Sequence, residues 1–341
     1  MRLRHAVTAL ILTGLLSWTD LLAFPKEEWD SIVREFEAGH GAAVVLITEP
    51  RSGRIEYASN LSRALNLVRS PGSLAKVWFA LTVGSANETV RCSGRFYPEP
   101  FMQIEPEDER TFHILRDENG QPYIACSVRH GHGLMNLTSA LTHSCNGYFL
   151  TLAAREPRQS LQNMIDRLGL LEHPGTGVRE ATETPARIRT APLSPLAATA
   201  SAIGEGGAIS LTPIRIAQTF GALFEGNGLL MRPILQGPSG SAARIAPGPN
   251  LGRVLEGLRH VADDGTLEGL ESEVERSGGP RIIFAKTGTP TVRDRRYQTH
   301  GWVVLYFEYL GANYLLTVFV ERGSGGQEAR ALTRSILLGL H

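Results

Sequence analysis

The spacing of apolar positions predicts strands at both ends of the chain. Four apolar residues between Trp29 and Phe36 recur at helical spacing and predict a first helix over 24–39. An apolar run at 42–47, a turn at 50–53 and an alternating segment at 54–58 then predict a β-hairpin. Near the other end, strands are expected at 281–285, 300–308 and 313–320, followed by a last helix over 327–340.

The middle of the chain has a different pattern. Residues 73–83 are apolar nearly all round, as expected of a helix buried at the centre of a domain. A polar, proline-containing stretch at 92–133 precedes helical segments at 137–154 and 161–171, a proline-rich linker at 187–195, and a helix that opens at Thr212-Pro213. The pattern predicts an α+β fold, in which distant segments form one sheet and a helical lobe is inserted at roughly 84–275.

The first 23 residues resemble a targeting segment. A basic start, Met1-Arg-Leu-Arg4-His5, precedes an apolar stretch and a possible cleavage site at Leu21-Leu-Ala23. The stretch is short for a membrane-spanning helix, so a cleaved signal peptide is favoured over an anchor. We therefore expect export to the periplasm or to the outer face of the cytoplasmic membrane, and association with the membrane through the N-terminus stays open.

Composition narrows the function classes. The 341 residues are enough for a large core, and 34 basic and 34 acidic residues give a formal net charge of zero. This balance gives no support for nucleic-acid binding, which requires a basic excess or stripe. Three cysteines are too few for a disulfide scaffold.

Three short motifs predict serine acyl-transfer chemistry. In the first, Ser73-Leu-Ala-Lys76, a spacing of three places the hydroxyl and the amine on one face of a helix, where Lys76 can deprotonate Ser73. Burial and a second cation, Lys286 of the third motif, would lower the pKa of Lys76. Ser73 alone would more often be a helix cap, so the prediction depends on the ordered set.

The other two motifs supply substrate contacts and donors. In Ser144-Cys-Asn146, the serine can relay a proton between Lys76 and the leaving group, and the amide of Asn146 can hydrogen-bond the substrate. In Lys286-Thr-Gly-Thr289, Thr287 and Thr289 can bind a substrate carboxylate, and Gly288 allows a peptide to approach as an added strand. The backbone N–H groups of Ser73 and Thr289 are the expected oxyanion hole.

Over residues 41–341 the chain resembles the transpeptidase domain of penicillin-binding proteins. The resemblance rests on the three motifs, the first hairpin, Gly204-Glu-Gly with Ser210-Leu-Thr-Pro213, Gly265-Thr266 and Gly301-Trp302. It implies a five-stranded antiparallel sheet packed by helices, an all-helical lobe, a catalytic cleft between them, and acylation of Ser73 by D-Ala-D-Ala peptides or β-lactams without a cofactor. Neither a glycosyltransferase domain nor the long N-terminal pedestal of class B members is expected.

The segment before Ser144 looks most like class B members, through Cys92-Ser-Gly94, Cys126 and His132-Gly133. These two cysteines, with His130 and His132, could form a zinc site, but the wide first gap differs from the usual finger spacings. In an exported protein a Cys92–Cys126 disulfide is favoured, and no metal is expected. Cys145 is predicted to be a small buried residue beside the site.

Three functions fit these features. The first is a peptidoglycan D,D-transpeptidase or carboxypeptidase that acts on stem peptides and is inhibited by β-lactams. The second is a serine β-lactamase; the Glu-x-x-Leu-Asn segment of class A enzymes does not follow Ser144, although class D enzymes lack that glutamate too. The third is a non-catalytic module that binds β-lactams or wall peptides. The sequence does not indicate protein partners.

Overall fold

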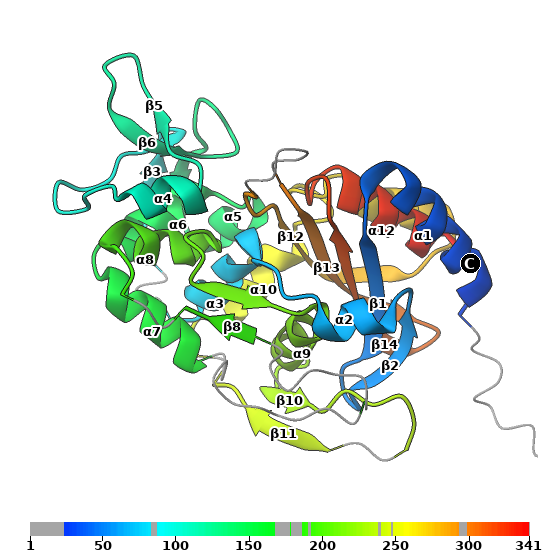
Figure 1. Cartoon of the computed structure of the whole chain (residues 1–341). Coiled ribbons are helices and arrows are strands. Elements are labelled where there is room, and N and C mark those ends of the chain that lie inside the picture. The colour runs from blue at the N-terminus through cyan, green and yellow to red at the C-terminus, as the bar shows by residue number, and fades with distance from the viewer. Residues whose placement is uncertain are drawn as a thin grey trace, which may run out of the picture.

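A five-stranded antiparallel sheet joins the two ends of the chain (Figure 1). The computed structural model describes residues 24–82, 87–167, 178, 186–189, 192–237, 240–246, 248–292 and 299–340. In spatial order the strands are β12 (Arg281–Gly288), β13 (Gly301–Tyr309), β14 (Ala312–Val320), β1 (Ala43–Glu49) and β2 (Arg54–Ala58). The α+β prediction, the hairpin and the five-stranded sheet are therefore confirmed.

The order of the strands follows from their burial. β1, β13 and β14 are buried at nearly every position, which requires cover on both faces of the sheet. α1 (Lys26–His40) and α12 (Glu328–Leu338) pack together on one face, and α9 (Pro213–Phe224) packs on the other. β12 pairs only with β13 among the described strands, so its outer edge faces the lobe that carries the rest of the site.

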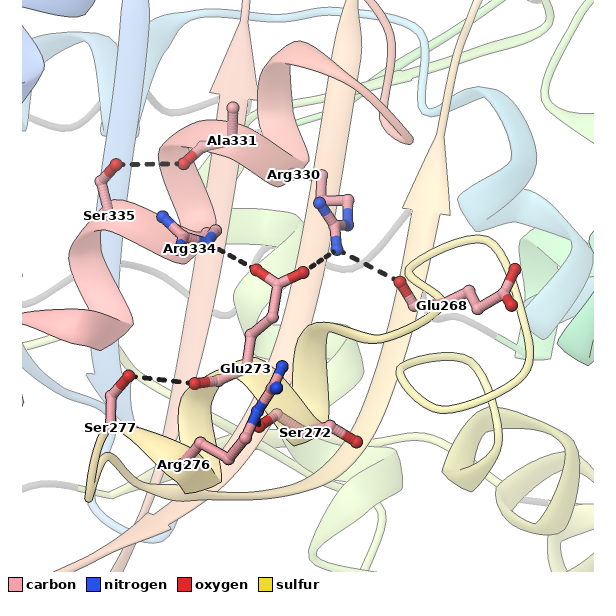
Figure 2. Close-up of polar contacts among 9 residues, drawn as sticks. All are labelled: Glu268, Ser272, Glu273, Arg276, Ser277, Arg330, Ala331, Arg334 and Ser335. Carbon is pink, nitrogen blue, oxygen red and sulfur yellow. Dashed lines mark hydrogen bonds and ion pairs between the residues drawn. The ribbon is translucent and has the colours of Figure 1, made fainter.

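Helices α1 and α12 are fixed to each other and to α11 (Leu270–Arg276) by polar contacts. The indole N–H of Trp29 donates a hydrogen bond of 3.0 Å to the carbonyl of Ile336. Figure 2 shows Glu273 of α11 between two arginines of α12; its carboxylate lies 2.9 Å from Nη2 of Arg330 and 2.5 Å from Nε of Arg334. The hydrogen bond of Trp29 is buried, whereas the two ion pairs are partly exposed, where such pairs contribute little to stability.

The segments between β2 and β12 contain small sheets as well as helices, so the inserted part of the chain is not all-helical as expected. Three small antiparallel sheets each have two strands: β3 with β7, β8 with β9, and β10 with β11. A fourth has three strands, with β6 between β4 and β5. The prolines of the 92–133 stretch explain part of this difference, because proline ends or kinks a helix and is tolerated at strand edges. The helices are α2 (Leu61–Asn66), α3 (Ala75–Ala80), α4 (Pro106–Thr111), α5 (Leu137–Thr142), α6 (Asn146–Ala153), α7 (Pro157–Arg167), α8 (Pro195–Ala200) and α10 (Leu251–Arg259). The short strands are β3 (Val90–Cys92), β4 (Arg95–Phe96), β5 (Leu115–Arg116), β6 (Pro122–Ala125), β7 (Gly133–Met135), β8 (Ala186–Ile188), β9 (Ile209–Leu211), β10 (Leu229–Met231) and β11 (Ser241–Arg244).

Two further expectations differ from the structure. The segment 137–154 is divided into α5 and α6 rather than forming one helix, and part of the expected linker at 187–195 belongs to β8, which pairs with β9. The predicted signal peptide at 1–23, Val83, and the end of the helix expected at 161–171 lie outside the described residues. Among the helices that are described, none combines the length and the apolar character needed to span a bilayer.

Candidate active site

Ser73 lies in a tight turn at the start of the buried helix α3. A 3₁₀ turn, Gly72–Leu74, leads directly into α3, so Ser73 and Lys76 are presented by continuous helical backbone as the spacing predicts. Val77, Trp78 and Phe79 of α3 are buried, which anchors the helix in the core. The hydroxyl of Ser73 faces a cavity, and it makes no hydrogen bond with any of the described residues.

The loop before Ser73 is held by β13 and by the turn at Gly204. The indole N–H of Trp302 on β13 donates to the carbonyl of Ser70 at 3.0 Å, and the Ser70 hydroxyl donates to the carbonyl of Gly204 at 2.6 Å. Gly204 has a φ of 74°, and a Cβ there would lie 2.0 Å from the carbonyl oxygen of Gly72. Only glycine permits this close approach, so the Gly204 turn sets the position of the nucleophile's loop.

Ser144 lies in the break between α5 and α6. Its φ of 53° places a non-glycine residue in the left-handed region, a conformation that costs about 1 kcal/mol or more and is frequent at functional sites. The break turns both the carbonyl and the hydroxyl of Ser144 towards Lys76, at 2.6 and 3.1 Å from its Nζ. A continuous helix would not present both groups in this way.

The two motif lysines converge on Ser144. Both side chains are fully buried, and the Ser144 Oγ lies 3.1 Å from Nζ of Lys76 and 2.9 Å from Nζ of Lys286. The Oδ1 atom of Asn146 accepts a 2.6 Å hydrogen bond from Lys76, and its Nδ2 donates to the carbonyl of Ala125 at 2.8 Å. Asn146 therefore positions Lys76, in addition to the substrate contact expected from the sequence.

Burial makes both amines easier to deprotonate. It lowers the pKa of Lys76 to about 8, although Cys126, Cys145 and Glu205 act in the opposite direction. For Lys286, burial and the neighbouring charge of Lys76 lower the pKa well below its ordinary value. Neither amine forms an ion pair with a carboxylate in the described part of the chain, so desolvation is not offset by a counter-ion.

The third motif lies at the end of the edge strand β12. The hydroxyls of Thr287 and Thr266 lie 2.7 Å apart, and the hydroxyl of Thr289 accepts a hydrogen bond of 3.0 Å from the N–H of Gly325. A Cβ on Gly288 would lie 2.5 Å from the carbonyl of Pro71. Glycine is therefore needed at position 288 because the loop before Ser73 approaches closely, and not because of a peptide, which could add along the outer edge of β12.

All three motifs border one cavity of about 700 Å³. Ser73, Ser144, Asn146, Thr287 and Thr289 line it, and so does Thr266. Thr289 is exposed directly after the end of β12, where it borders this space. The structure thus brings together every motif residue that the sequence singled out, from four separate elements.

Glu205 is a residue of the site that the sequence did not indicate. It follows Gly204, and its Oε1 accepts a 2.8 Å hydrogen bond from the backbone N–H of Thr291, just beyond the third motif. Burial raises the pKa of Glu205 to about 7, although the Thr291 donor and Lys76 act in the opposite direction. In the sequence, the Gly204-Glu-Gly segment contributed to the family resemblance but gave Glu205 no role.

The three cysteines form a cluster behind the break, and the expected Cys92–Cys126 disulfide is absent. All three thiols are free and buried. The sulfurs of Cys92 and Cys126 lie 3.7 and 3.4 Å from Nδ1 of His132, and the sulfur of Cys126 lies 4.0 Å from that of Cys145. Cys145 is buried beside the site as predicted, and His132 rather than His130 completes the cluster.

Comparison with known proteins supports the assignment of the fold. No curated protein sequence matches the chain. Among solved structures, the apo TP domain of Burkholderia pseudomallei penicillin-binding protein 3 has a TM-score of 0.66 at 18% identity, with 91% of each chain covered. Pseudomonas aeruginosa PBP2 in complex with WCK 5153 has a TM-score of 0.63 at 20% identity, covering 92% of this chain and 74% of that one.

A longer structural relative is Helicobacter pylori PBP2, solved in a complex with MreC. Its TM-score is 0.66 at 17% identity, and the match covers 91% of this chain but 62% of that one. At these identities the likeness shows the fold alone. The family model described as the penicillin binding protein transpeptidase domain matches residues 37–338, which include all three motifs and the whole sheet. The chain therefore belongs to the penicillin-binding protein transpeptidase family.

Proposed function

We propose that this protein is a peptidoglycan D,D-transpeptidase or D,D-carboxypeptidase that forms an acyl-enzyme on Ser73. The observation that carries the proposal is the convergence of two buried lysines on the Ser144 hydroxyl, beside a serine nucleophile in the same cavity. An amine with a pKa of about 8 is neutral in roughly one molecule in ten at pH 7, which is enough for a general base.

The proposed acylation proceeds in two proton transfers. Neutral Lys76 removes the proton of Ser73 as Oγ attacks the carbonyl carbon of the penultimate D-Ala. The backbone N–H groups of Ser73 and Thr289 stabilise the oxyanion. The C–N bond then breaks, and the leaving D-Ala amine receives the proton through Ser144, which contacts both lysines. A water or an amine acceptor releases the acyl group in the second half of the reaction.

The substrate would lie along the free edge of β12. An extended peptide can pair there by main-chain hydrogen bonds, as in other cases of strand addition. Its terminal carboxylate would lie near Thr287 and Thr289, with Lys286 as the nearby cation. Export to the periplasm or the outer face of the cytoplasmic membrane, proposed from residues 1–23, would place the enzyme beside such peptides.

A mass measurement tests the proposal. The protein is incubated with benzylpenicillin, and its intact mass is followed over hours beside Ser73→Ala. A long-lived adduct on the unchanged protein, absent from the variant, is expected. Fast turnover with loss of the drug would favour the β-lactamase alternative, and the absence of any adduct would leave only a non-catalytic binding module.

A synthetic D-Ala-D-Ala peptide separates the two wall activities. Release of D-Ala alone indicates carboxypeptidase activity, because water is then the acceptor. Formation of a cross-linked product with a second peptide amine indicates transpeptidation. Ser73→Ala serves as the control for both products. Both products are measured on one preparation of the unchanged protein, so a difference in folding cannot explain a difference between the two activities.

A further inference from the structure

Behind the catalytic break, four potential ligand atoms meet in a small buried space. The sulfurs of Cys92, Cys126 and Cys145 and Nδ1 of His132 all lie within 4.8 Å of one another. The three cysteines are at most 9% exposed, and His132 is partly buried. None of these side chains takes a step in the acyl transfer proposed above.

The distances approach those of a tetrahedral metal site. With metal–sulfur bonds of about 2.3 Å and metal–nitrogen bonds of about 2.0 Å, neighbouring ligand atoms lie about 3.5–3.8 Å apart. The structure has 3.4 Å between Cys126 and His132, 3.7 Å between Cys92 and His132, and 4.0 Å between the sulfurs of Cys126 and Cys145. Small side-chain shifts would close the cluster around one ion.

The backbone around the sulfurs favours thiolates. The N–H of Asn146 donates to the sulfur of Cys126 at 3.2 Å, and the N–H of Tyr148 donates to the sulfur of Cys145 at 3.5 Å. Both donors belong to the first turn of α6, whose dipole favours negative charge. A Cβ on Gly147 would lie 2.9 Å from the Cys92 sulfur, so glycine makes room for the third thiol on the same turn.

The ligands come from four places in the chain. Cys92 ends β3 and pairs with Gly133 at the start of β7, which places His132 beside it. Cys126 follows β6, and Cys145 lies between Ser144 and Asn146 in the break between α5 and α6. An ion held here would tie the two small sheets of the lobe to the catalytic break.

We infer that Cys92, Cys126, Cys145 and His132 bind one structural Zn²⁺ ion, which fixes the Ser144–Asn146 turn. Three soft thiolates and an imidazole select zinc among the common divalent metals, and four protein ligands leave no open position for chemistry. The ion acts through Cys145 on its two neighbours, so the four ligands are positioning residues. Binding releases the thiol protons to solvent, and no oxidant or reductant is needed.

Metal content tests the inference directly. The full chain is purified without chelators, and zinc per chain is measured by mass spectrometry beside His132→Ala and its matched control His130→Ala, an exposed histidine two residues away. We expect about one zinc per chain in the unchanged protein and in the control, and a large loss in His132→Ala. Three free thiols without metal, or a disulfide detected by the loss of two hydrogens, would overturn the inference.

A second measurement does not depend on the folding of a variant. The unchanged protein is stripped with a chelator and titrated with Co²⁺, for which the expected result is the absorption of a tetrahedral thiolate site at one ion per chain. The rate of benzylpenicillin acylation is then compared before stripping, after stripping and after addition of Zn²⁺. We expect a loss of tenfold or more that zinc restores. Stoichiometric metal with an unchanged acylation rate would refute the positioning role, and the metal assay stands even if no penicillin adduct forms.

Discussion

Basic side chains occur in two contrasting settings in this protein. Lys76 and Lys286 are fully buried and lie against hydroxyl, amide and carbonyl oxygens. Arg330 and Arg334 lie at the surface and share the carboxylate of Glu273 (Figure 2). The buried amines have lowered pKa values because burial is not offset by a counter-ion, whereas the two arginines share one carboxylate that is partly exposed to solvent.

The choice of residue follows the same division. Lys26, Lys76 and Lys286 are the only lysines of the sequence, and every other basic residue among its 34 is an arginine. A guanidinium stays protonated at any pH that a protein tolerates, so arginine cannot act as a general base. Two of the three lysines thus occur at the candidate site, where the proposed reaction moves a proton. The remaining one, Lys26, is exposed on α1.

Replacing the proposed base should give the largest effect. Lys76→Arg keeps a positive charge but removes the capacity to lose a proton, and we expect acylation of Ser73 by benzylpenicillin to slow by about 10²–10⁴-fold. The rate is measured by stopped-flow fluorescence or quenched mass spectrometry. Lys26→Arg is the matched control and should leave the rate unchanged. A Lys76→Arg variant as fast as the unchanged protein would mean that charge alone is needed.

Glu205 extends the comparison to a partly buried acid. Its pKa is raised to about 7, so the folded protein holds a proton that the unfolded chain has lost above about pH 4.5. The stabilisation from this proton is complete below pH 4.5 and is lost as the pH rises through 7. Glu205→Gln should therefore remove up to about 3 kcal/mol of pH-dependent change in the free energy of unfolding between pH 4.5 and 8.

Urea unfolding at a series of pH values measures this difference. Glutamine can still accept the hydrogen bond from Thr291, so the comparison isolates the titration from the contact. Parallel curves for Glu205→Gln and the unchanged protein would show that Glu205 titrates as an ordinary exposed acid. Glu308, which is partly buried at the end of β13, offers a control substitution to glutamine away from the site.

The surface pairs should give the smallest effect. Glu273→Gln removes both ion pairs with Arg330 and Arg334, yet the free energy of unfolding should fall by about 1 kcal/mol or less. The loss should shrink further at high salt, because salt screens exposed charges. Thermal unfolding at two ionic strengths measures this change. A salt-independent loss of several kcal/mol in the free energy of unfolding would show that these ion pairs differ less from the buried lysines than we propose.

The sheet and the short motifs that meet at the candidate site could be recognised in the sequence for a physical reason. The strands near both ends of the chain and α3 carry strong local patterns, and the motif residues need fixed spacing only within each short segment. Their convergence follows from the fold, which the family resemblance supplied. Glu205 could not be predicted as a residue of the site because it contacts the N–H of Thr291, 86 residues away, and no local pattern encodes that contact.

The cysteine cluster shows a different limit. The sequence did not favour a zinc site because the gap from Cys92 to Cys126 is wide. However, sequence spacing constrains only ligands that belong to one hairpin or finger. Here the ligands come from separate elements, and the break between α5 and α6 brings Cys145 to the others. The same break, with Ser144 in the left-handed region, was hidden within an apparently continuous helical pattern.

The most direct test of the account is to titrate Lys76 itself. With only three lysines, labelling of the lysine side chains with ¹³C gives a simple NMR spectrum, and Lys76→Arg assigns the signal of Lys76 by its disappearance. We expect a midpoint at about pH 8 for this amine in the unchanged, unacylated protein. A midpoint at the ordinary lysine value of 10.5 would contradict the claim that burial prepares Lys76 to act as the base.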